Sequence, residues 1–267
     1  MLTLEKHQTE SMNKQSRRNF FRQAGLGTAA VTAAPLFSGA AKPDDQAKLI
    51  DQFFSEGEIL LFQGDSITDA GRNKEHEVAN VANAFGTGYA LLTASWLLGE
   101  LATKKLTIHN RGISGNKVYQ LAERWDKDCL DLEPDVVSIL IGVNDYWHMR
   151  NGRYEGTPEI YENDFRSLLQ RTQTSLPGVR LIICQPFILP GTREVDETWI
   201  KPFIPYQEIA ARLAKEFNAV WVPFQEAFNQ ALQCAPATYW AGDGVHPSMA
   251  GAQLMAETWL QSIASSV

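Results

Sequence analysis

A serine, a histidine and an aspartate in this 267-residue chain occur in settings that suit nucleophilic catalysis. Ser66 lies in the segment GDSIT at residues 64–68, and Asp243 precedes His246 by three residues. A serine hydroxyl becomes a good nucleophile when a base removes its proton, and histidine suits this task because its pKa lies near neutrality. One short loop can carry Asp243 and His246, with the carboxylate fixing the imidazole tautomer. We therefore expect these three residues to form a catalytic triad.

Four polar, glycine-containing clusters follow apolar runs along the chain. After GDSIT come NRGISGN at residues 110–116, GVND at 142–145 and DGVHP at 243–247. Together and in this order they resemble the four blocks of the SGNH (GDSL-type) hydrolase superfamily, from about residue 59 onward. The resemblance implies these roles: nucleophile Ser66, oxyanion donors Gly115 and Asn144, general base His246 and orienting carboxylate Asp243.

Elementary chemistry supports the same roles. Attack on an ester builds negative charge on the carbonyl oxygen, and hydrogen-bond donors aimed at that charge stabilise the transition state. The backbone N–H groups of Ser66 and Gly115 and the side-chain amide of Asn144 would form such an oxyanion hole. Gly115 has no Cβ atom, so its backbone can approach a substrate closely. Serine chemistry needs no metal, and we expect no cofactor.

Each cluster also has a purely structural interpretation. Ser66 could cap a helix after the first strand, and Asn144 could belong to an Asx turn. His246 and the proline after it could simply begin the last helix. We favour the catalytic interpretation because nucleophile, base, orienting group and oxyanion donors all occur together. Asp65 is expected to hold the turn before Ser66 and to take no part in the chemistry.

Parallel strands joined by helices would bring the four clusters together. Short apolar runs predict five strands, at residues 58–63, 106–110, 135–141, 179–184 and 219–223. Segments of helical period predict helices at residues 88–101, 118–129, 158–174, 202–217 and 248–263. This alternation is typical of an α/β protein, a flavodoxin-like three-layer α/β/α sandwich with a five-stranded parallel sheet. Its sites lie at the carboxyl ends of the strands.

The N-terminal segment differs from the rest of the chain. Residues 16–22 read SRRNFFR, which resembles a twin-arginine export motif, and an apolar run at 24–37 and small residues at 38–41 follow. We therefore predict an export signal with a short linker at residues 1–45, a catalytic domain at 46–267, and a periplasmic or extracellular location. The alternatives are a basic tail and an uncleaved amphipathic anchor, and Met12 is a second candidate start.

Charge and cysteine content restrict the partners. The chain has 24 basic and 31 acidic residues, a formal net charge of −7. An acidic surface repels phosphate backbones and anionic headgroups, so we expect no nucleic-acid partner and no stable membrane association after signal removal. Three cysteines are too few for a disulfide framework. Cys184 is expected to be buried, and a bridge between Cys129 and Cys234 is left open.

The substrate is less constrained by the sequence. Tyr146, Trp147 and Trp240 could line a pocket and stack on sugar rings, or could pack at its rim, and His148 could also lie there. Export, an acidic surface and these aromatic residues favour a small-molecule or oligosaccharide substrate, chiefly short-acyl (acetyl) esters of carbohydrates. The alternatives are a lysophospholipase or general short-chain esterase or thioesterase, and a non-catalytic flavodoxin-like module that binds a phosphate after the first strand.

Overall fold

The structure, a computed structural model, describes residues 43–267, and in them five parallel strands form one sheet in the order β2-β1-β3-β4-β5. Each strand overlaps a predicted one, so the predicted number and type are confirmed. Their bounds are β1 (Ile59–Gly64), β2 (Thr107–Asn110), β3 (Val136–Leu140), β4 (Arg180–Cys184) and β5 (Val220–Val222).

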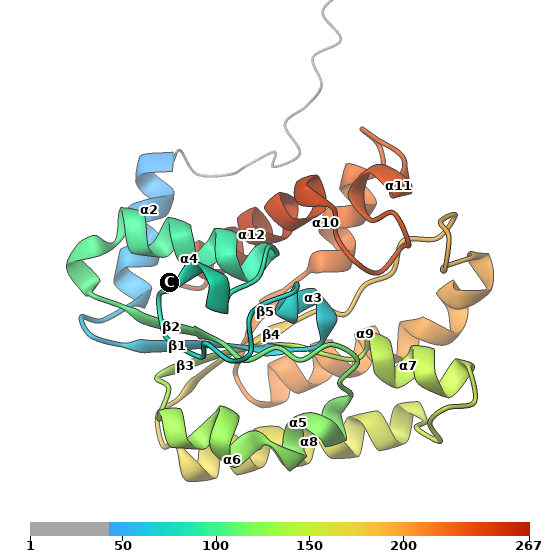
Figure 1. Ribbon diagram of the computed structural model, residues 1–267, viewed down its shortest axis with the longest axis horizontal. Helices are drawn as coiled ribbons and strands as arrows, with labels where there is room; N and C mark the ends of the chain where they lie inside the picture. The colour runs from blue at the N-terminus through green and yellow to red at the C-terminus, as the bar shows by residue number, and fades with distance from the viewer. Residues whose placement is uncertain (1–42) are drawn as a thin grey trace, which may run out of the picture. The chain divides into compact units, whose positions relative to one another are not determined.

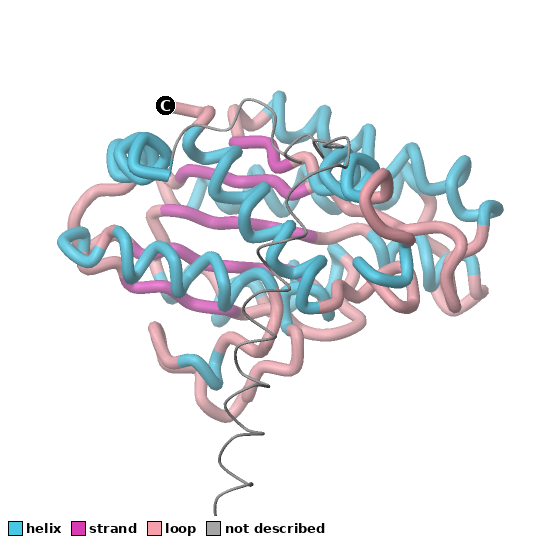
Figure 2. The backbone as a smooth tube through the Cα atoms, turned by 90° about the horizontal axis from the view of Figure 1, so that it is seen from above, coloured by secondary structure: helices cyan, strands magenta, loops and turns pink. Residues whose placement is uncertain are grey.

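Helices cover both faces of the sheet, which confirms the predicted three layers (Figure 1). On one face lie α2 (Pro43–Phe53), α4 (Tyr89–Glu100), α10 (Phe224–Ala231) and α12 (Met249–Ala264). On the other lie α5 (Val118–Glu123), α6 (Trp125–Asp128), α8 (Pro158–Ser175) and α9 (Ile200–Glu216). Figure 2 shows the strands of this sheet side by side, with helices lying across them. Shorter elements are α3 (Ser66–Asp69), α7 (Val143–Arg150), α11 (Ala237–Trp240), η1 (Ala82–Ala84), η2 (Ala102–Lys104), η3 (Leu130–Leu132) and η4 (Glu197–Trp199).

The central strands are apolar because helices cover both of their faces. Every residue of β3 is buried, and β1 is buried from its second residue onward. On one face, the indole of Trp259 in α12 donates a hydrogen bond to Ser138 Oγ of β3 at 3.0 Å. On the other, the indole of Trp125 donates to Thr172 Oγ1 of α8 at 3.0 Å. Trp259 is fully buried, and burying a large apolar side chain contributes about 1.5–3 kcal/mol, so this ring helps to hold α12 on the sheet.

The predicted helix over residues 118–129 is two helices, α5 and α6, which meet at Arg124. The guanidinium group of Arg124 donates hydrogen bonds to Arg111 O and to Asn116 Oδ1, both at 2.8 Å. These two acceptors belong to the loop after β2. The helix boundary therefore coincides with contacts to a distant segment, which local helix propensity does not encode.

Helix α2 opens the described part of the chain, and the predicted boundary between residues 45 and 46 falls inside it. The predicted export signal lies outside the described residues. Within residues 43–267, every helix is too short or too polar to cross a bilayer.

The three cysteines are all unpaired, so a bridge between Cys129 and Cys234 is excluded in this structure. Cys184 is buried, as predicted, and Cys129 is buried too. Burial raises the pKa of both buried thiols to about 12. These two thiols therefore stay protonated and poorly nucleophilic near neutral pH.

Candidate active site

The strand order brings the ends of β1 and β3 together at one edge of the sheet. The chain passes from β1 to β2 on one side and then returns to place β3 on the other side of β1. Gly64 of β1 pairs with Leu140 of β3, so the two strands end at the same level. Doubly wound sheets bind ligands at the point where the strand order reverses in this way. Ser66 follows β1 and Asn144 follows β3, so both lie at this edge.

Ser66 is the first residue of α3, a single helical turn that follows β1. Asp65 caps this turn, because its Oδ1 accepts a hydrogen bond from the N–H of Ile67 at 3.0 Å. The alternative in which Ser66 is the cap is therefore wrong, and the expected role of Asp65 in the turn is confirmed. A Cβ atom at position 64 would lie 2.3 Å from Leu140 O, so only glycine fits there.

Hydrogen bonds connect the three predicted triad residues in a line. The hydroxyl of Ser66 lies 2.8 Å from His246 Nε2, and His246 Nδ1 lies 2.7 Å from Asp243 Oδ2. Because Nδ1 faces a carboxylate, it holds the ring proton, and Nε2 is left to accept the proton of the serine. The structure therefore joins Ser66 to a histidine 180 positions later in the chain.

Electrostatics favour a charged Asp243 beside an accessible base. Burial raises the pKa of Asp243, but hydrogen bonds from the backbone and ring of His246 and from the N–H of Val245 outweigh it and hold that pKa below its ordinary value. The carboxylate is therefore ionised and can stabilise an imidazolium ion. The His246 side chain is 43% exposed, so a bulky substrate can reach it.

Neighbouring segments hold the loop of Asp243 and His246 in place. Gly244 O accepts a hydrogen bond from the N–H of Leu189 at 2.8 Å, and a Cβ atom on Gly244 would lie 2.5 Å from Leu189 O. Helix α12 begins only at Met249, with Ser248 as its cap. The interpretation that His246 merely starts the last helix is therefore wrong.

The predicted oxyanion donors lie in loops and helix starts at the same edge. Gly115 has a φ of 81°, a conformation that favours glycine. Asn144 is the second residue of α7, not part of an Asx turn, and its Nδ2 donates to Asn116 O at 3.3 Å. Within the described chain, the backbone N–H groups of Ser66 and Gly115 donate no hydrogen bond to another residue. These N–H groups are therefore free to bind an oxyanion.

Two buried carboxyl groups adjoin the catalytic segments. Asp65 precedes Ser66 and Asp145 follows Asn144, and in each carboxyl Oδ2 is buried without a partner within residues 43–267. Burial raises the pKa of both carboxyls to about 7. Asp145 Oδ1 accepts a hydrogen bond from the N–H of Val118 at 3.2 Å. Asp145 thereby fixes the start of α5 close to the segment of Gly115.

Two of the three aromatic residues predicted to line a pocket do not do so. Tyr146 is 1% exposed and packs against aromatic rings of α9 and the segment before it. Trp240 is 7% exposed, and its indole donates to the carbonyl oxygens of Ala231 and Ala235, both at 3.2 Å. Both rings support the scaffold instead. Trp147 is half-buried and remains a candidate for contact with substrate.

Lys117 is a further polar residue of this region that sequence analysis missed. Its Nζ lies 3.1 Å from His148 Nδ1 and 5.4–5.5 Å from the ring centres of Tyr119 and Tyr154. Burial and the nearby charge of Lys117 hold the pKa of His148 below its ordinary value. Lys117 follows Gly115 by two residues, but nothing in the sequence indicates that its side chain turns toward α7.

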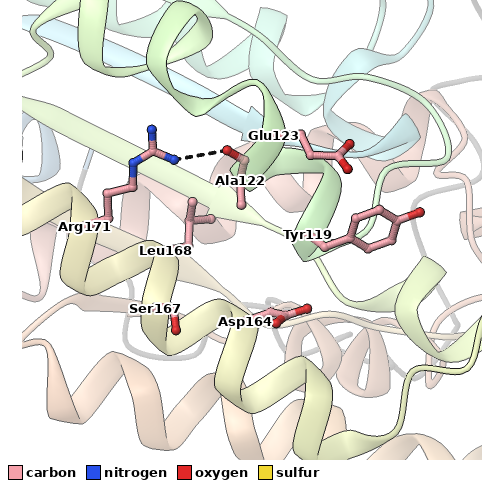
Figure 3. Close-up of a pocket in the computed structure, with 7 residues that line it drawn as sticks. All are labelled: Tyr119, Ala122, Glu123, Asp164, Ser167, Leu168 and Arg171. Atoms are coloured by element: carbon pink, nitrogen blue, oxygen red, sulfur yellow. Dashed lines mark hydrogen bonds between the residues drawn. The ribbon is translucent and has the colours of Figure 1, made fainter.

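A cavity of about 440 Å³ lies between α5 and α8 (Figure 3). In Figure 3 the side chains that line it come from one face of each helix, and Arg171 Nη1 donates to Ala122 O at 3.1 Å. The cavity contains none of the predicted catalytic residues, so it is separate from the candidate active site. Its lining residues are Tyr119, Ala122, Glu123, Asp164, Ser167, Leu168 and Arg171.

A parallel α/β sheet with a hydrogen-bonded Ser-His-Asp line at its carboxyl edge defines the class of serine hydrolases. Residues 62–254 match the GDSL-like Lipase/Acylhydrolase family. The chain belongs to this family, which confirms the resemblance seen in the sequence, and it is a carboxylic ester hydrolase. A non-catalytic binding module is therefore excluded.

Known proteins are similar to this chain. An acetylxylan esterase from Geobacillus stearothermophilus is 34% identical over 211 residues, covering 78% of this chain and 94% of that protein. Its crystal structure superposes with a TM-score of 0.72, covering 79% of this chain and 95% of the other. Variants of that esterase with a serine or a histidine replaced by alanine are known as catalytic mutants. A protein from Parabacteroides merdae that has been assigned to the GDSL-like lipases is 48% identical, with a TM-score of 0.77 over 79% of this chain and 97% of the other.

Proposed function

We propose that the protein removes short acyl groups, chiefly acetyl, from esterified carbohydrates, and that Ser66 is its nucleophile. The observation that carries the catalytic assignment is the line of hydrogen bonds from Ser66 through His246 to Asp243. In the first half of the reaction, Ser66 Oγ attacks the ester carbonyl carbon while His246 Nε2 takes the hydroxyl proton. Negative charge forms on the carbonyl oxygen and is met by the N–H groups of Ser66 and Gly115 and by the Asn144 amide.

The second half of the reaction restores the enzyme. The imidazolium of His246 gives its proton to the departing alcohol oxygen, and an acyl group remains on Ser66. A water molecule then loses a proton to His246 and attacks this acyl carbon. The acid leaves when the proton returns to Ser66 Oγ, so protons and bonds balance over the cycle.

Three observations support acetylated carbohydrate as the substrate. The similarity to an acetylxylan esterase extends over nearly the whole of that protein. The half-exposed imidazole of His246 is open enough for a substrate whose alcohol part is a large sugar. Trp147, half-buried on α7 three residues after Asn144, offers an aromatic surface on which a sugar ring can stack.

A panel of esters tests this proposal. With p-nitrophenyl esters of increasing acyl length, we expect kcat/KM to fall about tenfold or more between acetate and hexanoate, because each methylene that a small acyl pocket cannot accept weakens transition-state binding. We also expect acetate release from acetylated xylan oligosaccharides. A rate that rises beyond butyrate, without release of acetate from the oligosaccharides, would favour a lysophospholipase or a general esterase instead.

We also propose that residues 1–45 direct export by the twin-arginine route and that the domain from residue 46 acts outside the cytoplasm. The support is the sequence SRRNFFR with the apolar and small residues that follow. When the full chain is expressed in a bacterium with this pathway, its catalytic domain should appear in the periplasm or the medium. The double variant Arg17→Lys/Arg18→Lys should stay in the cytoplasm. Equal export of both proteins would contradict the proposal.

A further inference from the structure

Asp69 connects the helix of the nucleophile to the loop of a proposed oxyanion donor. It lies three residues after Ser66 on α3, and its side chain is 1% exposed. Its Oδ2 accepts two hydrogen bonds from Ser114, at 2.9 Å from the backbone N–H and at 2.6 Å from the hydroxyl. Ser114 directly precedes Gly115. One carboxylate therefore holds the residue next to this donor.

The loop also touches α3 before it reaches Ser114. A Cβ atom at Gly112 would lie 2.4 Å from the backbone nitrogen of Asp69, so the two backbones are in direct contact. Arg72 Nε donates to Gly112 O at 2.8 Å. By contrast, a Cβ atom at Gly115 would have no neighbour within 4 Å. The direction of the Gly115 N–H therefore depends on how the residues before it are held.

The geometry of the peptide bond explains why Ser114 matters. The N–H of Gly115 belongs to the rigid peptide plane that Ser114 begins. Asp69 fixes both the backbone nitrogen and the side chain of Ser114, so this plane has little freedom to turn. A displacement of a catalytic group by about 1 Å can lower the rate by about 10²-fold.

The charge of Asp69 strengthens these contacts. Lys74 Nζ lies 2.8 Å from Oδ2 and 3.0 Å from Oδ1 of Asp69. Burial raises the pKa of Asp69, but hydrogen bonds from Lys74 and Ser114 outweigh it and hold that pKa below its ordinary value. The carboxylate is therefore ionised at neutral pH, and hydrogen bonds to an ionised acceptor are about twice as strong as neutral ones.

We propose that Asp69 is a positioning residue that aims the Gly115 N–H at the oxyanion through its hydrogen bonds to Ser114. It contacts neither substrate nor reacting atoms. The inference rests on the proposed function only in taking Gly115 as an oxyanion donor, and it holds for any ester substrate.

Two substitutions test the inference with p-nitrophenyl acetate. Ser114→Ala removes one of the two hydrogen bonds to Asp69, and Asp69→Asn replaces the charged acceptor by a neutral one. We expect kcat to fall about tenfold for Ser114→Ala and somewhat more for Asp69→Asn, with KM within about twofold, because the loss is confined to the transition state. The rates are expressed per active site, titrated by the burst of p-nitrophenol. A merely structural role would lower the number of active sites but not kcat per site.

The control is Ser265→Ala, which removes an exposed hydroxyl that bonds to Gln261 O within the last turn of α12. It should retain the kcat of the parent protein. A kcat per active site in Ser114→Ala equal to that of the parent protein would overturn the inference. If Asp69→Asn does not fold, the result for Ser114→Ala is sufficient to test it. Failure of the proposed function would be seen separately, as activity that survives in Ser66→Ala or as no acetate release from oligosaccharides.

Discussion

Replacing Ser66 by alanine is expected to lower kcat/KM for p-nitrophenyl acetate by about 10⁴–10⁶-fold, the range found when one residue of a triad is removed. The reason is that the acyl-enzyme cannot form without this hydroxyl, which lies 2.8 Å from His246 Nε2. The fold should be unaffected, because Asp65 rather than Ser66 caps α3. Steady-state kinetics and thermal melting followed by circular dichroism measure both effects.

Replacement of His246, the proposed base, provides the comparison for the Ser66→Ala variant. We expect His246→Ala to lose about as much activity as Ser66→Ala, and the double variant to lose little more, because the residues of a triad act as a unit. Activity of Ser66→Ala within tenfold of the parent protein would show that another group is the nucleophile. Losses that multiply in the double variant would show that Ser66 and His246 act independently.

Asn144→Ala is expected to lower kcat by about 10²–10³-fold, the usual cost of removing one oxyanion donor. Its amide stabilises negative charge that exists only in the transition state, so KM should change by no more than about threefold. The structural cost should be about 1 kcal/mol, because the described structure shows one hydrogen bond from this side chain, to Asn116 O at 3.3 Å.

The matched control for this second prediction is Asn229→Ala, an exposed position on α10 whose side-chain oxygen accepts one hydrogen bond, from Gln225 Nε2 of the same helix at 3.0 Å. It should leave kcat unchanged. Urea denaturation separates a catalytic from a structural role for Asn144. A loss of several kcal/mol in the free energy of unfolding, with kcat per active site intact, would show that Asn144 maintains the fold and does not bind the oxyanion.

Most of the sheet could be predicted because its signal is local. Residues 135–141 are nearly all apolar, and the strand that they form, β3, is buried throughout. The strand order could not be predicted from the sequence, because it depends on which faces of the strands and helices pack together when the chain collapses. The short helices α3, α7 and α11 were not predicted, since segments of four to eight residues contain too few turns for a helical period to appear.

Side-chain burial near the site was the least predictable feature. Tyr146 and Trp147 are neighbours in the sequence, yet the first ring is buried among other aromatic rings and the second is half-buried. Helix α7, which was not expected, turns them in different directions. The same reason explains why Lys117 was missed, because its contact with His148 depends on how α7 lies beside the start of α5.

The sequence by itself determined which chemical groups are available and in what order they follow the strands, because each of the four clusters is a short local pattern. Only the tertiary structure decided which atoms meet. Ser66 and His246 are 180 positions apart, and Asp69 and Ser114 are 45 apart. Such pairs form only when parallel strands end at a common edge and helices cover both faces of the sheet, and short-range sequence patterns do not encode that arrangement.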